Sequence, residues 1–171
     1  MANLIDNGFR REFESGAVRD IQDGKGRCDL LPLDVAAELL ESAELNLINK
    51  FKESGKIQHL YEALHVFAAD NPFYSTETMF LEVSKHFEDG AKKYGENNWM
   101  QGIPAHCYID SAVRHYLKYC RNDKDEPHER AFAWNLMCCI WTCVHMPELN
   151  DYDRDRPIPG QLSLFGGKDG D

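Results

Sequence analysis

The sequence lacks the patterns that mark several common classes of protein. Its six cysteines form no Cys-x-x-Cys pair, so the usual zinc-site spacing is missing. No apolar stretch is long enough to cross a bilayer, and the first residues are too polar for a signal peptide. The formal net charge is −10, so the chain lacks the excess of cations with which proteins bind nucleic acids or membranes. We therefore expect a cytoplasmic protein that contacts neither nucleic acid nor a membrane directly.

Strand signals and internal repeats are also missing, and apolar residues recur at helical spacing instead. Because 171 residues fit one domain, we predict an all-α fold, a bundle of four or five helices. The helical domain spans residues 1–148 and begins with an irregular, glycine-punctuated segment, whereas residues 149–171 form a disordered, flexible tail. The predicted helices span residues 33–52, 57–69, 76–93, 104–120 and 127–145.

The last predicted helix is apolar on almost every side, which indicates that it is buried. His128, Asn135 and Thr142 interrupt it at intervals of seven residues and therefore share one line along it. A buried asparagine without hydrogen-bond partners costs about 1–3 kcal/mol. The line therefore faces either a polar cavity or a structural polar network between helices, and the sequence leaves both open.

Acidic residues gather where this helix begins. Glu126 and Glu129 are three residues apart and can converge on one hard cation such as Mg²⁺. Alternatively, they only favour the positive end of the helix dipole. Asp125 and His128 have half of the spacing of a di-iron bundle, but the sequence has no matching second half.

Cations and aromatic rings that suit a phosphorylated ligand lie in other parts of the chain. Arg114, on the polar side of the helix predicted at 104–120, presents paired donors for a phosphate. Asn98 and Trp99 lie in the preceding loop, where a tryptophan can stack on a base or plug the end of the bundle. Near the N-terminus, glycines alternate with three cations, Arg19, Lys25 and Arg27. This glycine-rich segment can wrap phosphates, although it lacks the Gly-Lys-Ser/Thr of a P-loop.

Five blocks carry a recognisable combination of residues: Gly16-Ala-Val-Arg-Asp20, Gly24-Lys-Gly-Arg27 with Leu30-Leu-Pro32, Gly90 to Trp99, Arg114-His115 and Asp125 to Asn135. Together they resemble the phage and prophage dATP/dGTP diphosphohydrolase N-terminal domain family, which is related to the MazG-like all-α nucleotide pyrophosphohydrolases. The resemblance runs from about residue 14 to residue 146, and the Gly-Ala-Lys-Lys-Tyr-Gly-x-x-Asn-Trp block is its most specific part.

The resemblance implies that the chain hydrolyses a deoxynucleoside triphosphate such as dATP or dGTP to the monophosphate and pyrophosphate. The implied cofactor is Mg²⁺, or Mn²⁺ in its place, and the implied metal ligands are Glu126, Glu129, Asp110 and Asp89. Catalytic roles fall to His115, His128 and Glu129. The substrate would contact Arg19, Lys25, Arg27, Lys92, Lys93, Asn98, Trp99, Arg114 and Asn135.

The MazG-like enzymes carry Glu-x-x-Glu followed by Glu-x-x-Asp on facing helices. Glu126-Pro-His-Glu129 is similar to the second motif, with glutamate in place of aspartate, whereas the first motif has no clean match. The resemblance also implies a homodimer or homotetramer in a bacterial or phage-infected host cell.

The tail contains a second motif, Gln161-Leu-Ser-Leu-Phe165, which resembles the pentapeptide that docks proteins on the bacterial replicative sliding clamp. Leu162, Leu164 and Phe165 would be its apolar anchors, and Gln161 begins the motif. Alternatively, the segment packs back on the bundle or matches by chance. If the tail does dock, a different class of function follows: a non-catalytic module that senses nucleotides and is recruited to the clamp.

Overall fold

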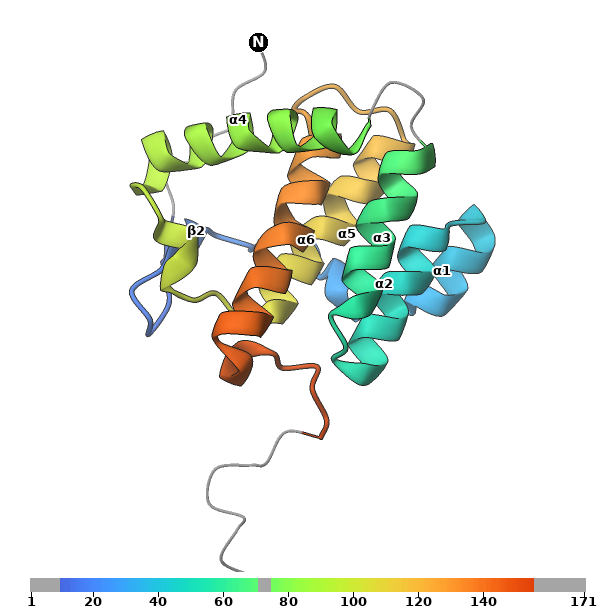
Figure 1. Ribbon diagram of the computed structural model, residues 1–171, viewed down its shortest axis with the longest axis horizontal. Helices are drawn as coiled ribbons and strands as arrows, with labels where there is room; N and C mark the ends of the chain where they lie inside the picture. The colour runs from blue at the N-terminus through green and yellow to red at the C-terminus, as the bar shows by residue number, and fades with distance from the viewer. Residues whose placement is uncertain (1–9, 71–74, 156–171) are drawn as a thin grey trace, which may run out of the picture.

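The structure is a computed structural model that describes residues 10–70 and 75–155, and it confirms the predicted all-α class (Figure 1). The described residues form six α-helices: α1 (Leu33–Leu40), α2 (Ala43–Ser54), α3 (Gln58–Asp70), α4 (Thr76–Tyr94), α5 (Ala105–Cys120) and α6 (His128–His145). Three short 3-10 turns accompany them: η1 (Cys28–Leu30), η2 (Asn98–Gln101) and η3 (Pro147–Leu149).

The helix predicted at 33–52 is two helices, so that prediction was wrong. Glu41 ends α1 in the left-handed conformation, with φ of 50°. Ser42 then caps α2, because its side chain accepts a hydrogen bond from the backbone N–H of Leu45. The apolar spacing continues across this break, and the periodicity alone therefore concealed it.

The expectation that the chain has no strand was also wrong. Strand β1 (Arg10–Glu12) pairs antiparallel with β2 (Val18–Asp20), and Arg11 lies opposite Arg19. The side chain of Asn98 extends the hairpin, since its amide donates to Val18 O and accepts from Val18 N, both at 2.8 Å. Strands of three residues are too short to show an alternating apolar pattern, and the contact that fixes them comes from 80 residues away.

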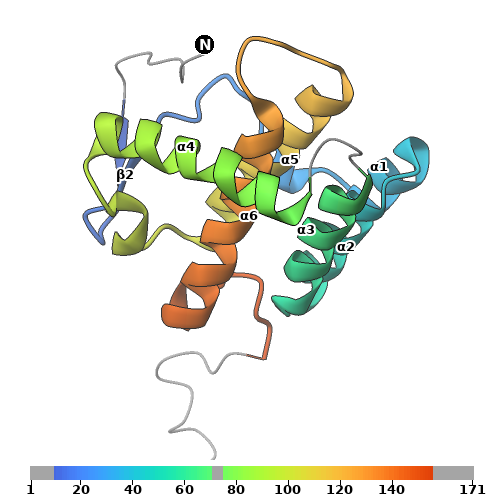
Figure 2. The same ribbon diagram turned by 45° about the horizontal axis from the view of Figure 1, so that its top comes forward.

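Helix α6 lies at the centre of the molecule, as its apolar sequence predicts. Helix α5 runs along it, α4 crosses it at one end, and α1 to α3 lie to one side (Figures 1 and 2). Phe132 of α6 is fully buried between the rings of Phe67 and Tyr116, whose centroids lie 4.7 and 5.2 Å away. The hairpin lies on the other side of α6, near the end of α4 (Figure 1).

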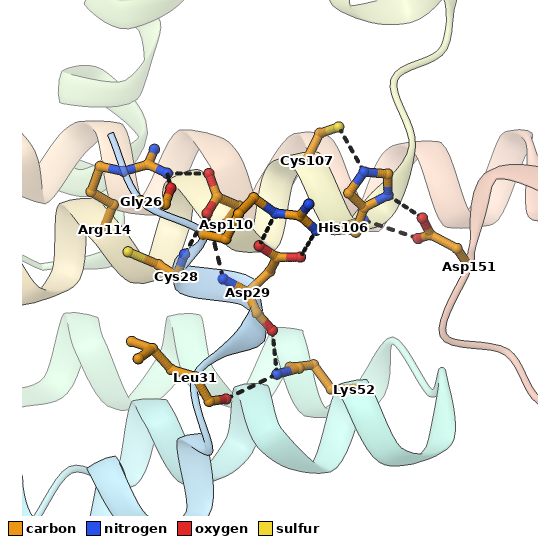
Figure 3. Close-up of polar contacts among 11 residues, drawn as sticks. Gly26, Cys28, Asp29, Leu31, Lys52, His106, Cys107, Asp110, Arg114 and Asp151 are labelled. Atoms are coloured by element: carbon orange, nitrogen blue, oxygen red, sulfur yellow. Dashed lines mark hydrogen bonds and ion pairs between the residues drawn. The ribbon is translucent and has the colours of Figure 1, made fainter. Parts of the chain in front are cut away.

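The irregular N-terminal segment is attached to the helices by polar contacts around η1 (Figure 3). Asp110 Oδ1, on α5, accepts hydrogen bonds from the backbone N–H groups of Cys28 at 2.6 Å and Asp29 at 3.4 Å. Lys52, on α2, donates to the carbonyls of Asp29 at 2.5 Å and Leu31 at 3.3 Å. These bonds hold the preceding glycine-containing turn against α5.

The chain beyond α6 packs against the helices through residues 150–153. Asn150 Nδ2 donates to the carbonyl of Gly55 at 2.9 Å, and the ring of Tyr152 meets that of Phe51 edge-on at 5.4 Å. Asp151 accepts a hydrogen bond from His106 N at 2.9 Å and forms an ion pair with the His106 imidazole (Figure 3). The first residues assigned to the tail by the sequence therefore contact the helical domain.

Candidate functional site

A cavity of about 790 Å³ lies between the hairpin, α4, α5 and α6. Aromatic rings form one side of it, including Phe87, Trp99 and Trp134, and these rings pack on one another. Cationic side chains from the N-terminal segment and α5 line another part of it, together with carboxylates such as Asp20, Asp110 and Glu126. An apolar wall beside a cationic wall suits an amphipathic organic anion.

One end of the cavity is bordered by a cluster of two histidines and a glutamate. The Nδ1 atoms of His115 and His128 lie 3.0 Å apart. Glu126 Oε1 lies 3.8 Å from each of these nitrogens, and the three ligand atoms lie within 4.8 Å of one another. Only 15% of the His115 and Glu126 side chains and 1% of the His128 side chain are exposed. Three donors so close together can hold one metal ion.

The sequence positions these three residues on two elements that meet. His115 lies on α5, whereas Glu126 and His128 lie on either side of Pro127, at the start of α6. Burial lowers the pKa of His115 well below its ordinary value, and the neighbouring His128 lowers it further. A neutral imidazole has the lone pair that a metal ligand requires.

Asp125 and Lys118 form a second layer around this cluster. Asp125 Oδ1 lies 2.8 Å from His128 Nε2, and Asp125 Oδ2 accepts a hydrogen bond from Lys118 at 2.9 Å. Both contacts hold the pKa of Asp125 well below its usual value, and the hydrogen bond from Lys118 has the larger effect. The carboxylate is therefore ionised at neutral pH and favours a proton on His128 Nε2.

The cationic wall is built from distant parts of the chain. Arg19 Nη2 donates to Asn135 Oδ1 at 2.5 Å, and its guanidinium lies 5.1 Å from the centre of the Tyr108 ring. Arg114 forms an ion pair with Asp110 and donates to the carbonyl of Gly26 at 2.9 Å. It thereby fixes the turn that carries Lys25 to the edge of the cavity.

Four cavity-lining side chains contain a buried nitrogen without a hydrogen-bond partner in the described part of the chain: Arg19 Nη1, Gln22 Nε2, His86 Nδ1 and Trp134 Nε1. His86 is 7% exposed, and burial lowers its pKa to about 3, with Arg130 and Arg19 adding to the effect. Buried polar groups are normally paired, so several unpaired nitrogens around one cavity indicate a missing acceptor-rich partner.

The structure brings together only part of the metal ligand set that the sequence predicts. Glu126 lies in the cluster, whereas Glu129 belongs neither to it nor to the cavity lining. Asp110 is 1% exposed and holds η1 and Arg114. Asp89 forms an ion pair with Arg130 at 2.8 Å. The four predicted carboxylate ligands therefore do not converge on one point in the structure.

The predicted substrate contacts also divide into two sets. Those that line the cavity are Arg19, Lys25, Asn98, Trp99, Arg114 and Asn135. The other three cations do not line it and form ion pairs: Arg27 with Asp29 at 2.6 Å, Lys92 with Glu88 at 2.5 Å and Lys93 with Asp20 at 2.7 Å. Residues 161–165, with the predicted clamp-binding motif, lie outside the described residues.

Several cavity residues were absent from the predicted site. His86 and Trp134 gave only a weak signal, since each carries a polar group that needs a hydrogen-bond partner once it is buried. Gln22 and Lys118 gave none, because a polar residue in a turn or on a helix face is ordinary. Their positions follow from how the hairpin and α5 pack together.

The fold and the site define an all-α protein with a cavity lined by aromatic and cationic side chains, beside a candidate metal centre. Residues 75–152 match the family model for dATP/dGTP diphosphohydrolase, N-terminal. The resemblance seen in the sequence motifs is therefore confirmed over that stretch, which contains α4, α5, α6 and the whole imidazole–carboxylate cluster. No curated protein and no solved structure matches the chain. None of the described helices is long and apolar enough to span a bilayer.

Proposed function

We propose that this chain hydrolyses purine deoxynucleoside triphosphates to the monophosphate and pyrophosphate within the cavity. The observation that carries the proposal is the set of unpaired buried nitrogens beside a cationic wall, because a triphosphate offers many acceptor oxygens. The description of the matching family, dATP/dGTP diphosphohydrolase, names the same class of substrate. A cavity of about 790 Å³ is also in the size range of sites for small organic ligands.

The walls of the cavity suit the two ends of such a nucleotide. Trp99 and Trp134 offer ring faces and edges on which a base can stack. Arg19 and Lys25 supply positive charge for the phosphates, and Arg19 retains donors that no protein group uses. Arg114 acts indirectly, since its guanidinium is engaged by Asp110 and the turn carbonyls and therefore positions Lys25.

A divalent ion fits the residues at the end of the cavity. His115, Glu126 and His128 would hold it, because their donor atoms converge and both imidazoles can present a lone pair. Such an ion would neutralise phosphate oxygens and would lower the pKa of a bound water, the nucleophile that the hydrolysis needs. The cationic side chains then stabilise the charge that develops on the phosphate oxygens. The ion implied by the sequence resemblance is Mg²⁺ or Mn²⁺.

A nucleotide panel tests the proposal. Purified full-length chain is incubated with each of the four deoxynucleoside and four ribonucleoside triphosphates and with a divalent ion. Pyrophosphate and inorganic phosphate are measured separately, and the nucleotide product is identified by chromatography. We expect pyrophosphate and a monophosphate from dATP and dGTP. Release of inorganic phosphate alone, or no release from any nucleotide with any ion, would refute the proposal.

Self-association remains a proposal as well, and exposed apolar side chains support it. Val35 and Leu39 on α1 are 52% and 79% exposed, and Leu30 in η1 is 68% exposed. Val35 and Leu39 are one turn apart on α1, and neighbouring exposed apolar side chains favour contact with another protein surface. Sedimentation of the purified chain distinguishes the monomer from the dimer and tetramer that the sequence resemblance implies.

A further inference from the structure

The candidate metal centre has a mixed set of donor atoms. Two of its three donors are imidazole nitrogens and one is a carboxylate oxygen. Mg²⁺ prefers oxygen ligands and retains several waters, whereas imidazole nitrogen suits the later first-row transition metals. Two nitrogens bound to one ion at about 2.1 Å and at right angles lie about 3.0 Å apart. The nitrogens of His115 and His128 already have this separation, 3.0 Å.

The contact with Asp125 determines which nitrogen of His128 is available to an ion. Because Nε2 lies 2.8 Å from a carboxylate oxygen of Asp125, and such an oxygen accepts hydrogen bonds, this contact favours the tautomer that leaves the Nδ1 lone pair toward His115. A carboxylate on the far nitrogen of a metal-binding histidine fixes the tautomer and the ring orientation. Lys118 in turn holds the other oxygen of Asp125 at 2.9 Å.

A hydrogen bond between the two imidazoles, without any ion, is the main competing explanation, since 3.0 Å suits such a bond. It does not account for the position of the Glu126 carboxylate, whose Oε1 lies equally far from both nitrogens. The contacts of the Glu126 carboxylate with His115, His128 and Lys118 measure 3.8, 3.8 and 3.9 Å, and each is longer than a hydrogen bond. An ion between the three side chains would satisfy this carboxylate together with both nitrogens.

A second group of convergent donors, Asp123, Asp125 and His128, shares one histidine with the first. Its two carboxylates already have cationic partners, because Arg121 pairs with Asp123 and Lys118 pairs with Asp125. Their charge is therefore largely compensated. These contacts indicate that Asp125 orients His128 and is not itself a metal ligand.

We infer that His115, Glu126 and His128 bind one later first-row transition metal ion, such as Co²⁺, in preference to Mg²⁺. Asp125 is the positioning residue for His128. The role of this ion in hydrolysis rests on the proposed function. Binding of the ion itself needs no nucleotide and is measured without one.

The test is a titration of metal-stripped, full-length chain with Co²⁺, Mn²⁺ and Mg²⁺ by isothermal calorimetry, in the absence of nucleotide. We expect one Co²⁺ per chain and at least about 100-fold tighter binding of Co²⁺ than of Mg²⁺. Visible absorption of the Co²⁺-loaded chain reports the ligand field directly. His115→Gln and His128→Gln should each abolish high-affinity binding and change that spectrum. Thermal melting of the stripped variants establishes that they fold.

Asp125→Asn tests the positioning role, and Asp123→Asn is its matched control on the same connector. We expect Asp125→Asn to weaken Co²⁺ binding by about 10–100-fold and to shift the visible spectrum. The Asp123→Asn chain should bind Co²⁺ like the unsubstituted chain. A purely structural role for Asp125 would lower the melting temperature and leave the spectrum of the bound ion unchanged.

Binding of Mg²⁺ as tight as that of Co²⁺ would overturn the inference, and so would Co²⁺ binding that survives both histidine substitutions. Equal losses in Asp123→Asn and Asp125→Asn would instead assign the ion to the second group of donors, and this also contradicts the inference. Pyrophosphate release is measured separately, so Co²⁺ binding without hydrolysis would refute only the proposed function. Hydrolysis with Mg²⁺ and no high-affinity Co²⁺ site would refute only the inference.

Discussion

Arg19 and Asn135 are 116 residues apart in the chain and share a hydrogen bond of 2.5 Å between Nη2 and Oδ1. Asn135 is 2% exposed and donates its own amide to the carbonyl of Ala131 at 2.8 Å. The bond therefore attaches β2 to the central helix and satisfies a buried side chain. It also places a guanidinium with a spare donor at the cavity.

Arg19→Ala should weaken nucleotide hydrolysis. The loss of hydrogen bonds from a charged donor is worth about 1.5–3 kcal/mol, which corresponds to about 10–100-fold in kcat/KM for dGTP. Melting should also occur at a lower temperature, because Asn135 loses a partner. Arg121→Ala removes an exposed ion pair with Asp123 and serves as the control. A kcat/KM equal to that of the Arg121 variant would exclude Arg19 from substrate binding.

Glu126→Gln should slow hydrolysis strongly, whereas Glu129→Gln should not. Replacing a charged ligand removes several kcal/mol of electrostatic stabilisation, and we expect a fall in kcat of at least about 100-fold for Glu126→Gln. Glu129 lies outside the cluster of donors, so its variant should remain within a few-fold of the unsubstituted chain. Pyrophosphate release at saturating metal measures both. Equal losses would favour the Glu126–Glu129 pair that the sequence predicts.

The ion pair between His106 and Asp151 should make stability depend on pH. The Asp151 carboxylate, with a smaller contribution from Cys107, raises the pKa of His106 to about 10. Because the folded pKa exceeds the unfolded value of about 6.5, the stabilisation is complete below pH 6.5 and is lost as the pH rises toward 10. Both side chains are partly exposed, at 29% and 38%, so we expect about 1 kcal/mol or less.

Urea unfolding of Asp151→Asn measures this contribution. Its free energy of unfolding should be lower than that of the unsubstituted chain at pH 6, and the difference should shrink as the pH approaches 10. Asp153→Asn, two residues further along the same segment, should show no such convergence. If the difference in free energy of unfolding between Asp151→Asn and the unsubstituted chain stays constant with pH, the contact with Asp151 does not raise the pKa of His106.

Two glycine substitutions should change stability in opposite directions. Gly55 has φ of 68°, and a Cβ there would lie 2.5 Å from the Cα atom of Asp153. Gly55→Ala should therefore strain the turn and push away residues 150–153, at a cost of about 1–3 kcal/mol. Gly90 lies within α4, and a Cβ there meets nothing within 4 Å. Gly90→Ala should stabilise the chain by about 0.5–1 kcal/mol. Thermal unfolding of both variants measures these changes. A lower melting temperature for Gly90→Ala would contradict the prediction that α4 has room for a Cβ at this position.

Local sequence determined most of the helices of this protein. Helix α6 could be predicted because its apolar residues cover nearly every side, and α4 because Ser75 caps it and Gly95 follows its last residue. The break at Glu41 was hidden because the apolar spacing runs through it, although a serine follows. Such signals act within one or two turns of a helix and depend little on the rest of the fold.

The tertiary structure alone decided which polar residues share a site. As carboxylates, Asp110 and Glu126 are equally suited to bind a metal ion. In the fold, however, Asp110 accepts hydrogen bonds from backbone N–H groups that only the folded N-terminal segment brings to it. The pairing of His115 with His128 depends on how α5 turns back along α6. Helix formation depends on residues that are neighbours in the sequence. The partners of a buried charge depend on contacts between residues far apart in the chain, and these contacts could not be predicted from the sequence alone.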